Sequence, residues 1–132
     1  MQSKREFIRL HWHNVVCSLV DRLFSAEKWR VEIVGTDRRI IWATTTDTES
    51  AAWDAAHAYT LEHIEAVRQL REEIAVLVPF AKGRTEESLS VMPLWAKDSI
   101  PSLLAEGAAI NRTIERLESA LADKLRGTRE GQ

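Results

Sequence analysis

The chain of 132 residues contains a single cysteine and no long apolar run. One cysteine cannot form a disulfide within the chain, which agrees with a reducing compartment. The longest apolar run, AVLVPFA at 75–81, is far shorter than the roughly 20 residues that span a bilayer. The basic start, MQSKREFIRL, is followed by HWHN instead of the apolar core of a signal peptide. We therefore expect a cytoplasmic protein without a membrane segment.

An excess of charge of one sign is also missing, because the formal net charge is only −2. The charges are nevertheless segregated: residues 1–46 carry eight basic and five acidic side chains, whereas residues 47–78 carry two basic and seven acidic ones. A nucleic-acid-binding domain usually has a concentrated basic stripe, and this chain has only scattered basic residues. We therefore do not expect nucleic acid to be the main partner.

The remaining composition, 45% hydrophobic and 29% charged, is that of an ordinary globular protein. A length of 132 residues fits one domain. We predict a single domain over residues 1–126. The polar sequence GTREGQ that follows predicts a disordered tail over residues 127–132.

Residues 5–24 read as a first helix with a period of about 100° per residue. Its apolar side chains cover nearly the whole circumference, and only a narrow polar strip is left. The strip consists of Asn14, Ser18, Asp21 and Arg22. Such a helix needs cover on more than one side. In so small a protein a second subunit can supply this cover, so we expect a homodimer.

The segment KWRVEIVGTDRRIIWATTT at 28–46 predicts a β-hairpin with its turn at residues 35–38. Pairing about this turn sets Val31 opposite Trp42 and Ile33 opposite Ile40, so large apolar side chains share one face. The other face is mixed and is open to solvent or to a contact. It carries Arg30, Glu32, Val34, Arg39 and Ile41.

A long helix is predicted from the capping sequence TDTE at 46–49 to about residue 78, where Pro79 ends it. Its apolar seam has spacings of three and four and requires a partner helix. The seam consists of Trp53, Ala56, Thr60, His63, Val67, Leu70, Ile74 and Leu77. The far side forms an acidic face, which consists of Asp54, Glu62, Glu65, Glu72 and Glu73.

Residues 79–99 read as an irregular connector, in which residues 88–92 could add a short edge strand. A last helix begins near Asp98 or Ser99, with Pro101 in its first turn, and ends at about Arg126. The predicted fold class is α+β, with the order α-β-β-α-(β)-α. Three helices pack with an antiparallel hairpin sheet, which has two strands, or three if residues 88–92 join it.

The stretch HWHNVVC at 11–17 suggests a metal or nucleophile site. In a helix, His11 and His13 point about 200° apart, so they cannot bind one ion. His13 and Cys17 share a face and could supply two zinc ligands or a thiol with its base, but a structural zinc site needs four ligands. We interpret Cys17 as a small core residue.

Asp54 and His57, three apart, could be two metal ligands with Glu62 or Glu65 further round, but an acidic amphipathic helix produces such pairs by chance. We therefore predict no metal, no cofactor and no catalytic residue. His63 lies on the apolar seam. It is expected to be a partly buried, hydrogen-bonded histidine whose titration makes packing sensitive to pH.

Two surfaces could bind a partner protein. The acidic face could mimic a phosphate backbone, or it could be a solvated helix surface with local support from Arg68 to Glu72. Trp95, beside Met92 and Leu94 in the connector, could anchor a partner or pack over the hairpin. In an alternative hypothesis the hairpin arginines touch nucleic-acid phosphates. These are Arg30, Arg38 and Arg39.

The stretch RVEIVGTDRRIIWATTTDTESAAWDAAHAYT resembles a layout of small phage and mobile-element proteins: a hairpin with a tryptophan, a threonine-rich exit and an alanine-rich helix that starts with AAW. The resemblance covers about a quarter of the chain and implies no functional residues. It implies an accessory role, such as inhibition of a host defence complex in the manner of anti-CRISPR proteins. Our hypothesis is a non-enzymatic interaction protein or inhibitor; the alternatives are a nucleic-acid-binding regulator and a metal-dependent enzyme.

Overall fold

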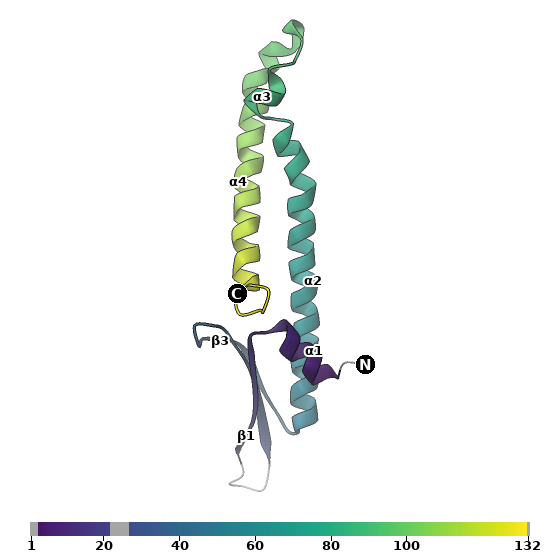
Figure 1. The fold of residues 1–132 in the computed structure, drawn as a ribbon, viewed down its shortest axis with the longest axis vertical. Helices are drawn as coiled ribbons and strands as arrows, with labels where there is room; N and C mark the ends of the chain where they lie inside the picture. Colours follow the sequence, from purple (N-terminus) through teal and green to yellow (C-terminus); the bar gives the residue numbers. More distant parts are fainter. Residues whose placement is uncertain (1–2, 22–26, 132) are drawn as a thin grey trace. The chain divides into compact units, whose positions relative to one another are not determined.

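The computed structural model describes residues 3–21 and 27–131, which fold as an α+β protein with a three-stranded antiparallel sheet (Figure 1). The predicted fold class is confirmed. The chain divides into two compact units. The first contains the described residues of 1–66 and 122–132, and the second contains residues 67–121. Helix α2 (Glu49–Lys82) contributes its first half to the first unit and its second half to the second.

The sheet of the first unit is built from β1 (Asn14–Asp21), β2 (Lys28–Val34) and β3 (Ile40–Thr46), in that order. The prediction of one helix over residues 5–24 is therefore wrong. Helix α1 (Lys4–His11) ends at His11. Of the described residues that follow it, Asn14–Asp21 form strand β1. Residues 22–24 lie outside the described part.

The alternation of exposed and half-buried side chains along β1 explains the error. Val15, Cys17 and Leu19 are half-buried, whereas Val16, Ser18 and Val20 are exposed. Apolar residues on both faces of a short strand also satisfy a helical period, so the pattern alone could not distinguish the two structures. The apolar surface of the supposed helix is in fact divided between two sides of a sheet. The homodimer was expected because that helix needed cover on more than one side. This reason no longer holds, and the homodimer stays a prediction.

The hairpin of β2 and β3 is confirmed, but its register differs from the prediction. Ile33 lies opposite Trp42 and Val31 opposite Thr44, because the register shifts between Ile33 and Val34. The difference from the predicted pairing is two residues. An even difference keeps Val31, Ile33 and Trp42 on their predicted face, since the period of a strand is two. Ile40, which lies beyond the register shift, instead pairs with Val34 of the other face and is 52% exposed, so its predicted place on the core face is wrong.

The core of the first unit lies between α1, one face of the sheet and the first half of α2. Its buried residues are Ile8, Trp12, Val31, Ile33, Ala52, Trp53 and Ala56. The indole Nε1 of Trp12 donates to Thr60 Oγ1 at 2.9 Å, and this hydroxyl donates to the carbonyl of Ala56 at 2.7 Å. Both polar atoms are buried, so each has the partner that a buried donor requires.

Residues 127–131 make specific contacts, although a disordered tail was expected there. Gly127 follows the end of α4 (Ile100–Leu125) with φ 89°, a conformation that favours glycine. Its carbonyl accepts from His13 N at 2.7 Å, and Arg129 N donates to the carbonyl of His11 at 3.0 Å. Thr128 is 1% exposed and pairs with Trp12 in an isolated bridge. The C-terminal segment is thus docked on the junction of α1 and β1.

The second unit is a helical hairpin, in which the second half of α2 packs against the main part of α4 (Figure 1). The predicted last helix is confirmed, with Pro101 in its first turn. The predicted seam of α2 is less exposed than its neighbours in this unit, at Val67, Leu70, Ile74 and Leu77. An apolar stripe on α4 is likewise less exposed, and it consists of Leu103, Ile110, Ile114, Leu117 and Leu121. Helix α2 passes the predicted end at Pro79 and continues to Lys82. The proline removes one backbone donor, but the turns on either side of it keep the helix intact.

The connector between these helices contains no strand at residues 88–92. Residues 86–89 form the one-turn helix α3 (Glu86–Leu89), and a 3₁₀ helix, η1 (Leu94–Ser99), follows it. The optional third strand predicted here is therefore wrong. Thr85 caps α3, because its Oγ1 accepts from Ser88 N at 3.1 Å. This cap stabilises a turn that alternation of apolar residues and serines did not indicate.

Candidate functional site

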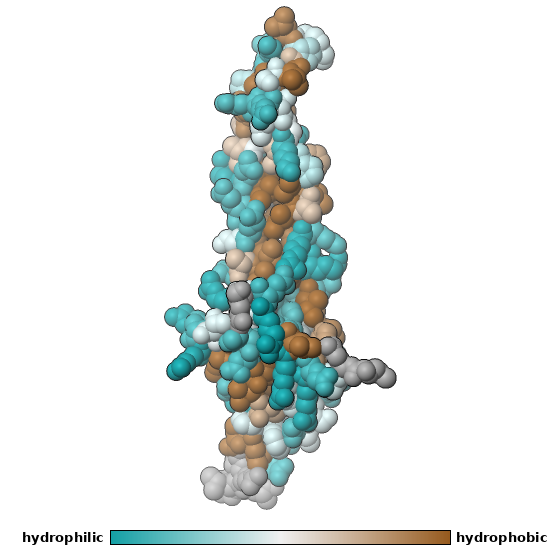
Figure 2. Space-filling view, in the orientation of Figure 1, coloured by the Kyte–Doolittle hydropathy of each residue, from teal (hydrophilic) through white to brown (hydrophobic). Residues whose placement is uncertain are grey.

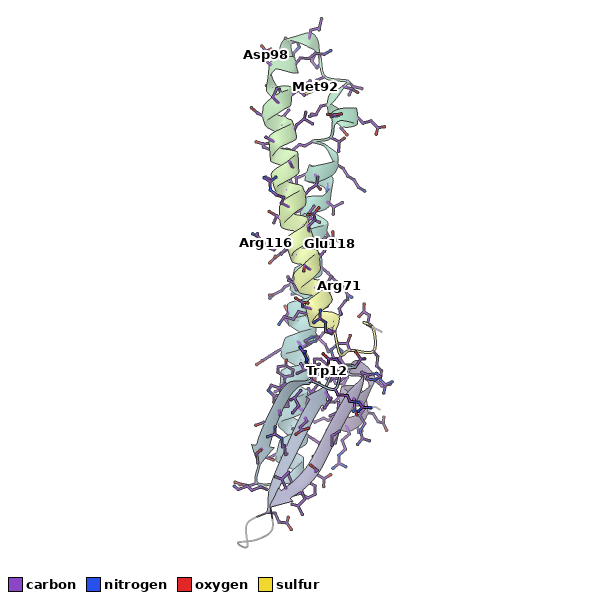
Figure 3. The ribbon with its side chains drawn as sticks, turned by 90° about the vertical axis from the view of Figure 1, so that its left-hand side faces the viewer. Trp12, Arg71, Met92, Asp98, Arg116 and Glu118 are labelled. Carbon is purple, nitrogen blue, oxygen red and sulfur yellow. The ribbon has the colours of Figure 1, made fainter. Side chains whose placement is uncertain are left out.

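Three large apolar side chains project from the connector of the second unit. Val91 and Trp95 are each 85% exposed and Leu94 is 83% exposed. We call these three residues the apolar tip. In Figure 2 apolar side chains lie among polar ones at the end of the helical hairpin where this connector lies, and Figure 3 shows its neighbours Met92 and Asp98 there. The exposure of Trp95 agrees with the anchor hypothesis and not with packing in a core.

The base of the connector is held by polar and close backbone contacts. Arg84 Nε donates to Glu106 Oε2 at 2.9 Å and joins the connector to α4. Gly107 lies so close to Arg84 that a Cβ atom on it would be 2.5 Å from the Arg84 carbonyl oxygen. Leu89, the last residue of α3, is buried. The apolar tip therefore projects from a packed support and does not belong to a loose end.

The predicted acidic face does not form one free carboxylate surface. Asp54 bonds Lys4 at 2.9 Å in the first unit, and Glu72 bonds Arg68 in the second. The second contact is the local support expected for a solvated face. The side chains of Glu62, Glu65 and Glu73 are exposed on α2.

In the second unit, Glu72 and Glu73 border a groove of about 490 Å³ between α2 and α4. Val76 and Leu117 contribute apolar surface to this groove, and Arg116 lies on its α4 side. The lining is mixed in charge. A basic partner would therefore meet a cation beside the two carboxylates, which weakens the phosphate-mimicry hypothesis for this segment.

The three hairpin arginines do not converge. Arg30 Nε donates to Glu32 Oε1 at 2.6 Å on β2, whereas Arg38 and Arg39 lie in the turn. Arg38 has φ 66°, and Arg39 is within 3.6 Å of Asp37. Four residues of strand separate Arg30 from the start of the turn, which is about 16 Å at the usual rise. These positions do not form the single basic patch that the nucleic-acid alternative requires.

Cys17 and His57 pack against other side chains of the first unit, whereas His13 is exposed. Cys17 lies on β1 against the core, and burial, with a smaller effect of Glu49, raises the pKa of its thiol. The neutral thiol is a poor nucleophile and metal ligand. His13 is exposed outside any helix, so it does not share a helix face with Cys17. The ring of His57 contacts Phe7, with 5.5 Å between centroids, whereas Asp54 is paired with Lys4.

His63 is buried and hydrogen-bonded, as predicted. Its Nε2 lies 2.7 Å from the carbonyl oxygen of Lys124, and its Nδ1 lies 2.9 Å from Nε2 of His11. Burial lowers the pKa of His63. The pairing with His11 had no signal in the sequence, because the two residues are 52 positions apart and His11 was placed in the middle of a helix.

Among residues 3–21 and 27–131, no group of three or more histidine, cysteine, aspartate or glutamate side chains gathers in a geometry that could hold a metal ion. In the same part of the chain, no helix has both the length and the apolar character needed to cross a bilayer. Comparison with known proteins finds no matching family, no similar curated protein and no similar solved structure.

Proposed function

We propose that this protein acts by binding another protein, without catalysis of its own, and that the apolar tip is the anchor of that contact. The observation that carries the proposal is the joint exposure of Val91, Leu94 and Trp95. Protein surfaces rarely leave several large apolar side chains together in water unless they bind something there. Burial of one such side chain contributes about 1.5–3 kcal/mol. Tryptophan is also enriched among the residues that dominate binding energy.

The charges around the apolar tip favour a protein over a lipid surface. Glu86, Glu87 and Asp98 are exposed nearby, with Lys82 and Lys97 as exposed cations, so the acidic side chains are in slight excess. Anionic membranes attract basic segments, so this acidic surrounding opposes binding to them. It favours a partner whose apolar pocket has a basic rim.

The non-enzymatic part of the proposal is supported by the state of the reactive side chains. The thiol of Cys17 is packed against the core, and both ring nitrogens of His63 are hydrogen-bonded. Asp54 and Glu72 are each engaged by a basic side chain. A group with its protons and lone pairs already committed is poorly placed for general acid or base catalysis.

The narrower hypothesis, an inhibitor of a nucleic-acid-binding host defence complex, depends on the acidic residues of α2 and not on the apolar tip. Likewise, a homodimer is compatible with the proposal but does not follow from it. The apolar tip supports protein binding in either case, so the experiment below does not presuppose the identity of the partner.

The test is site-specific photocrosslinking in cells, with p-benzoylphenylalanine at position 95 and, as a matched control, at Val76, which is 62% exposed in the same unit. We expect a discrete adduct with one protein from position 95 and none from position 76. The purified partner should then bind Trp95→Ala at least about tenfold more weakly, a loss of about 1.4 kcal/mol. Equal adducts at both positions, or unchanged affinity of the variant, contradict the proposal. Flotation of the wild-type chain, but not of the variant, with anionic vesicles assigns the apolar tip to a membrane and overturns it.

A further inference from the structure

A small polar pocket lies in the first unit, where the docked C-terminal segment meets the junction of α1 and β1. Its volume is about 180 Å³. It is lined by Arg9, Trp12, His13, Asn14, Val15 and Arg129. Trp12, which forms one wall, is labelled in Figure 3. The pocket is separate from the apolar tip, which belongs to the second unit.

Arg129 is held in this pocket by both its backbone and its side chain. Its amide donates to the carbonyl of His11 at 3.0 Å, and its Nε donates to the carbonyl of Arg9 at 2.7 Å. A guanidinium has five N–H donors, so these contacts leave its terminal nitrogens available. The fork is therefore positioned in advance, which reduces the entropy lost when it binds a ligand.

Neither Arg9 nor Arg129 forms a salt bridge with a carboxylate within the part of the chain that the structure describes. Other arginines of the same unit do form salt bridges, because Arg5 bonds Glu49 at 3.0 Å and Arg126 bonds Asp123 at 2.9 Å. The guanidinium of Arg9 instead lies over the ring of Trp53, 5.2 Å from the centroid. A cation–π contact is not a hydrogen bond, so it does not engage the N–H donors of Arg9.

We propose that this pocket binds a phosphate group. The lining combines two arginines, a histidine and an asparagine, residue types whose N–H groups bind a tetrahedral oxyanion, and no carboxylate belongs to it. The volume corresponds to about six water molecules at liquid density, which is room for one phosphate group. The ligand is thus inorganic phosphate or the phosphoryl end of a larger molecule.

Phosphate in this pocket would bridge segments far apart in the chain, because Arg9 and Arg129 are separated by 120 positions. Binding should therefore hold the C-terminal segment against α1 and β1. A ligand that binds only the folded state also stabilises it in proportion to its occupancy. Phosphate should accordingly raise the melting temperature of the wild-type chain.

The test is an NMR titration of the ¹⁵N-labelled full chain with inorganic phosphate, at an ionic strength held constant with chloride. We expect saturable shifts of the amides of His13, Asn14 and Arg129. Arg129→Gln should weaken binding at least about tenfold, since a charge-assisted pair to phosphate contributes more than a neutral one. Arg39→Gln, which alters an arginine that is 88% exposed on its side chain in the hairpin turn, should bind like the wild type.

A second variant, Arg9→Gln, leaves the backbone carbonyl that holds Arg129 in place, so it covers the case in which Arg129→Gln disturbs the fold. It should also lose affinity. Tighter binding of O-phosphoserine than of inorganic phosphate assigns the site to a phosphomonoester, and the reverse assigns it to the free ion. An unsaturated response equal to that of chloride, acetate binding as tight as phosphate, or equal affinity of the Arg9→Gln and Arg39→Gln variants overturns the proposal.

Discussion

The Nε2 atom of His11 and the Nδ1 atom of His63 lie 2.9 Å apart and join the end of α1 to α2. A backbone carbonyl only accepts hydrogen bonds, so the contact with Lys124 O requires the proton of His63 on Nε2. Nδ1 of His63 must then accept from His11. This hydrogen bond can persist when one proton is added to the pair. A second proton breaks it, because two imidazolium rings would point an N–H group at each other and neither nitrogen could accept.

Acidification should therefore weaken the fold. Burial lowers the pKa of both rings, and the charge of His63 lowers that of His11 further. The unfolded chain binds protons at the ordinary histidine pKa of 6.5, so it takes up more protons than the folded chain just below that pH. The stabilisation is complete above the unfolded value and is lost as the pH falls toward the lowered folded values. Urea unfolding measured over a pH series should show this decline.

The matched variants for the pH experiment are His63→Gln and His13→Gln. The first removes one titrating member of the pair and should flatten the decline, although it also lowers the stability at neutral pH. The second changes an exposed histidine that is not part of the pair and is the control for the loss of a histidine elsewhere in the chain. A slope that is the same in all three proteins, or a fold that becomes more stable on acidification, would contradict this role of the pair.

Thr60→Val should destabilise the first unit without a change in side-chain volume. The substitution leaves the buried Nε1 of Trp12 without its acceptor, which costs about 1–3 kcal/mol. Thr45→Val is the control, because Thr45 is exposed on β3 and valine suits a strand. Chemical denaturation should separate the two variants; equal stabilities would show that the Trp12–Thr60 bond contributes nothing.

Two glycines of the second unit should respond in opposite ways to alanine. A Cβ on Gly107 would lie 2.5 Å from the Arg84 carbonyl oxygen, so Gly107→Ala should cost about 1–3 kcal/mol through displacement of the connector. A Cβ on Gly83 would have no neighbour nearer than 3.6 Å. Gly83→Ala should be neutral or stabilise by up to about 1 kcal/mol. Thermal unfolding of both variants checks the packing of the connector, and a Gly107→Ala protein as stable as the wild type would refute it.

Sequence periodicity was sufficient for the hairpin and the two long helices, because each has one buried face and a distinct turn or cap. It failed at β1, where Val16 and Val20 are apolar but exposed on the open face of the sheet. A pattern that is apolar on both sides has no unique period. The position of Pro79 was also misleading, because tertiary packing of α2 outweighs the lost backbone bond.

The candidate sites were predictable only where one residue was anomalous by itself. Trp95 was recognised because the connector around it has no apolar periodicity that would place its side chain in a core. Val91 was missed, since it fitted a short strand. Arg129 was missed for a different reason: its pocket depends on contacts with Arg9 and His11, and no local pattern reports contacts between the two ends of a chain.

The exposure of Trp95 can be measured without a partner, by ¹⁹F NMR of the chain labelled with 5-fluorotryptophan. Substitution of each tryptophan in turn assigns the five resonances. We predict a full solvent isotope shift between H₂O and D₂O for Trp95 and none for Trp12, which is completely buried. A Trp95 resonance as insensitive to solvent as that of Trp12 would mean that the apolar tip is already covered, and the proposed anchor for a partner protein would then be wrong.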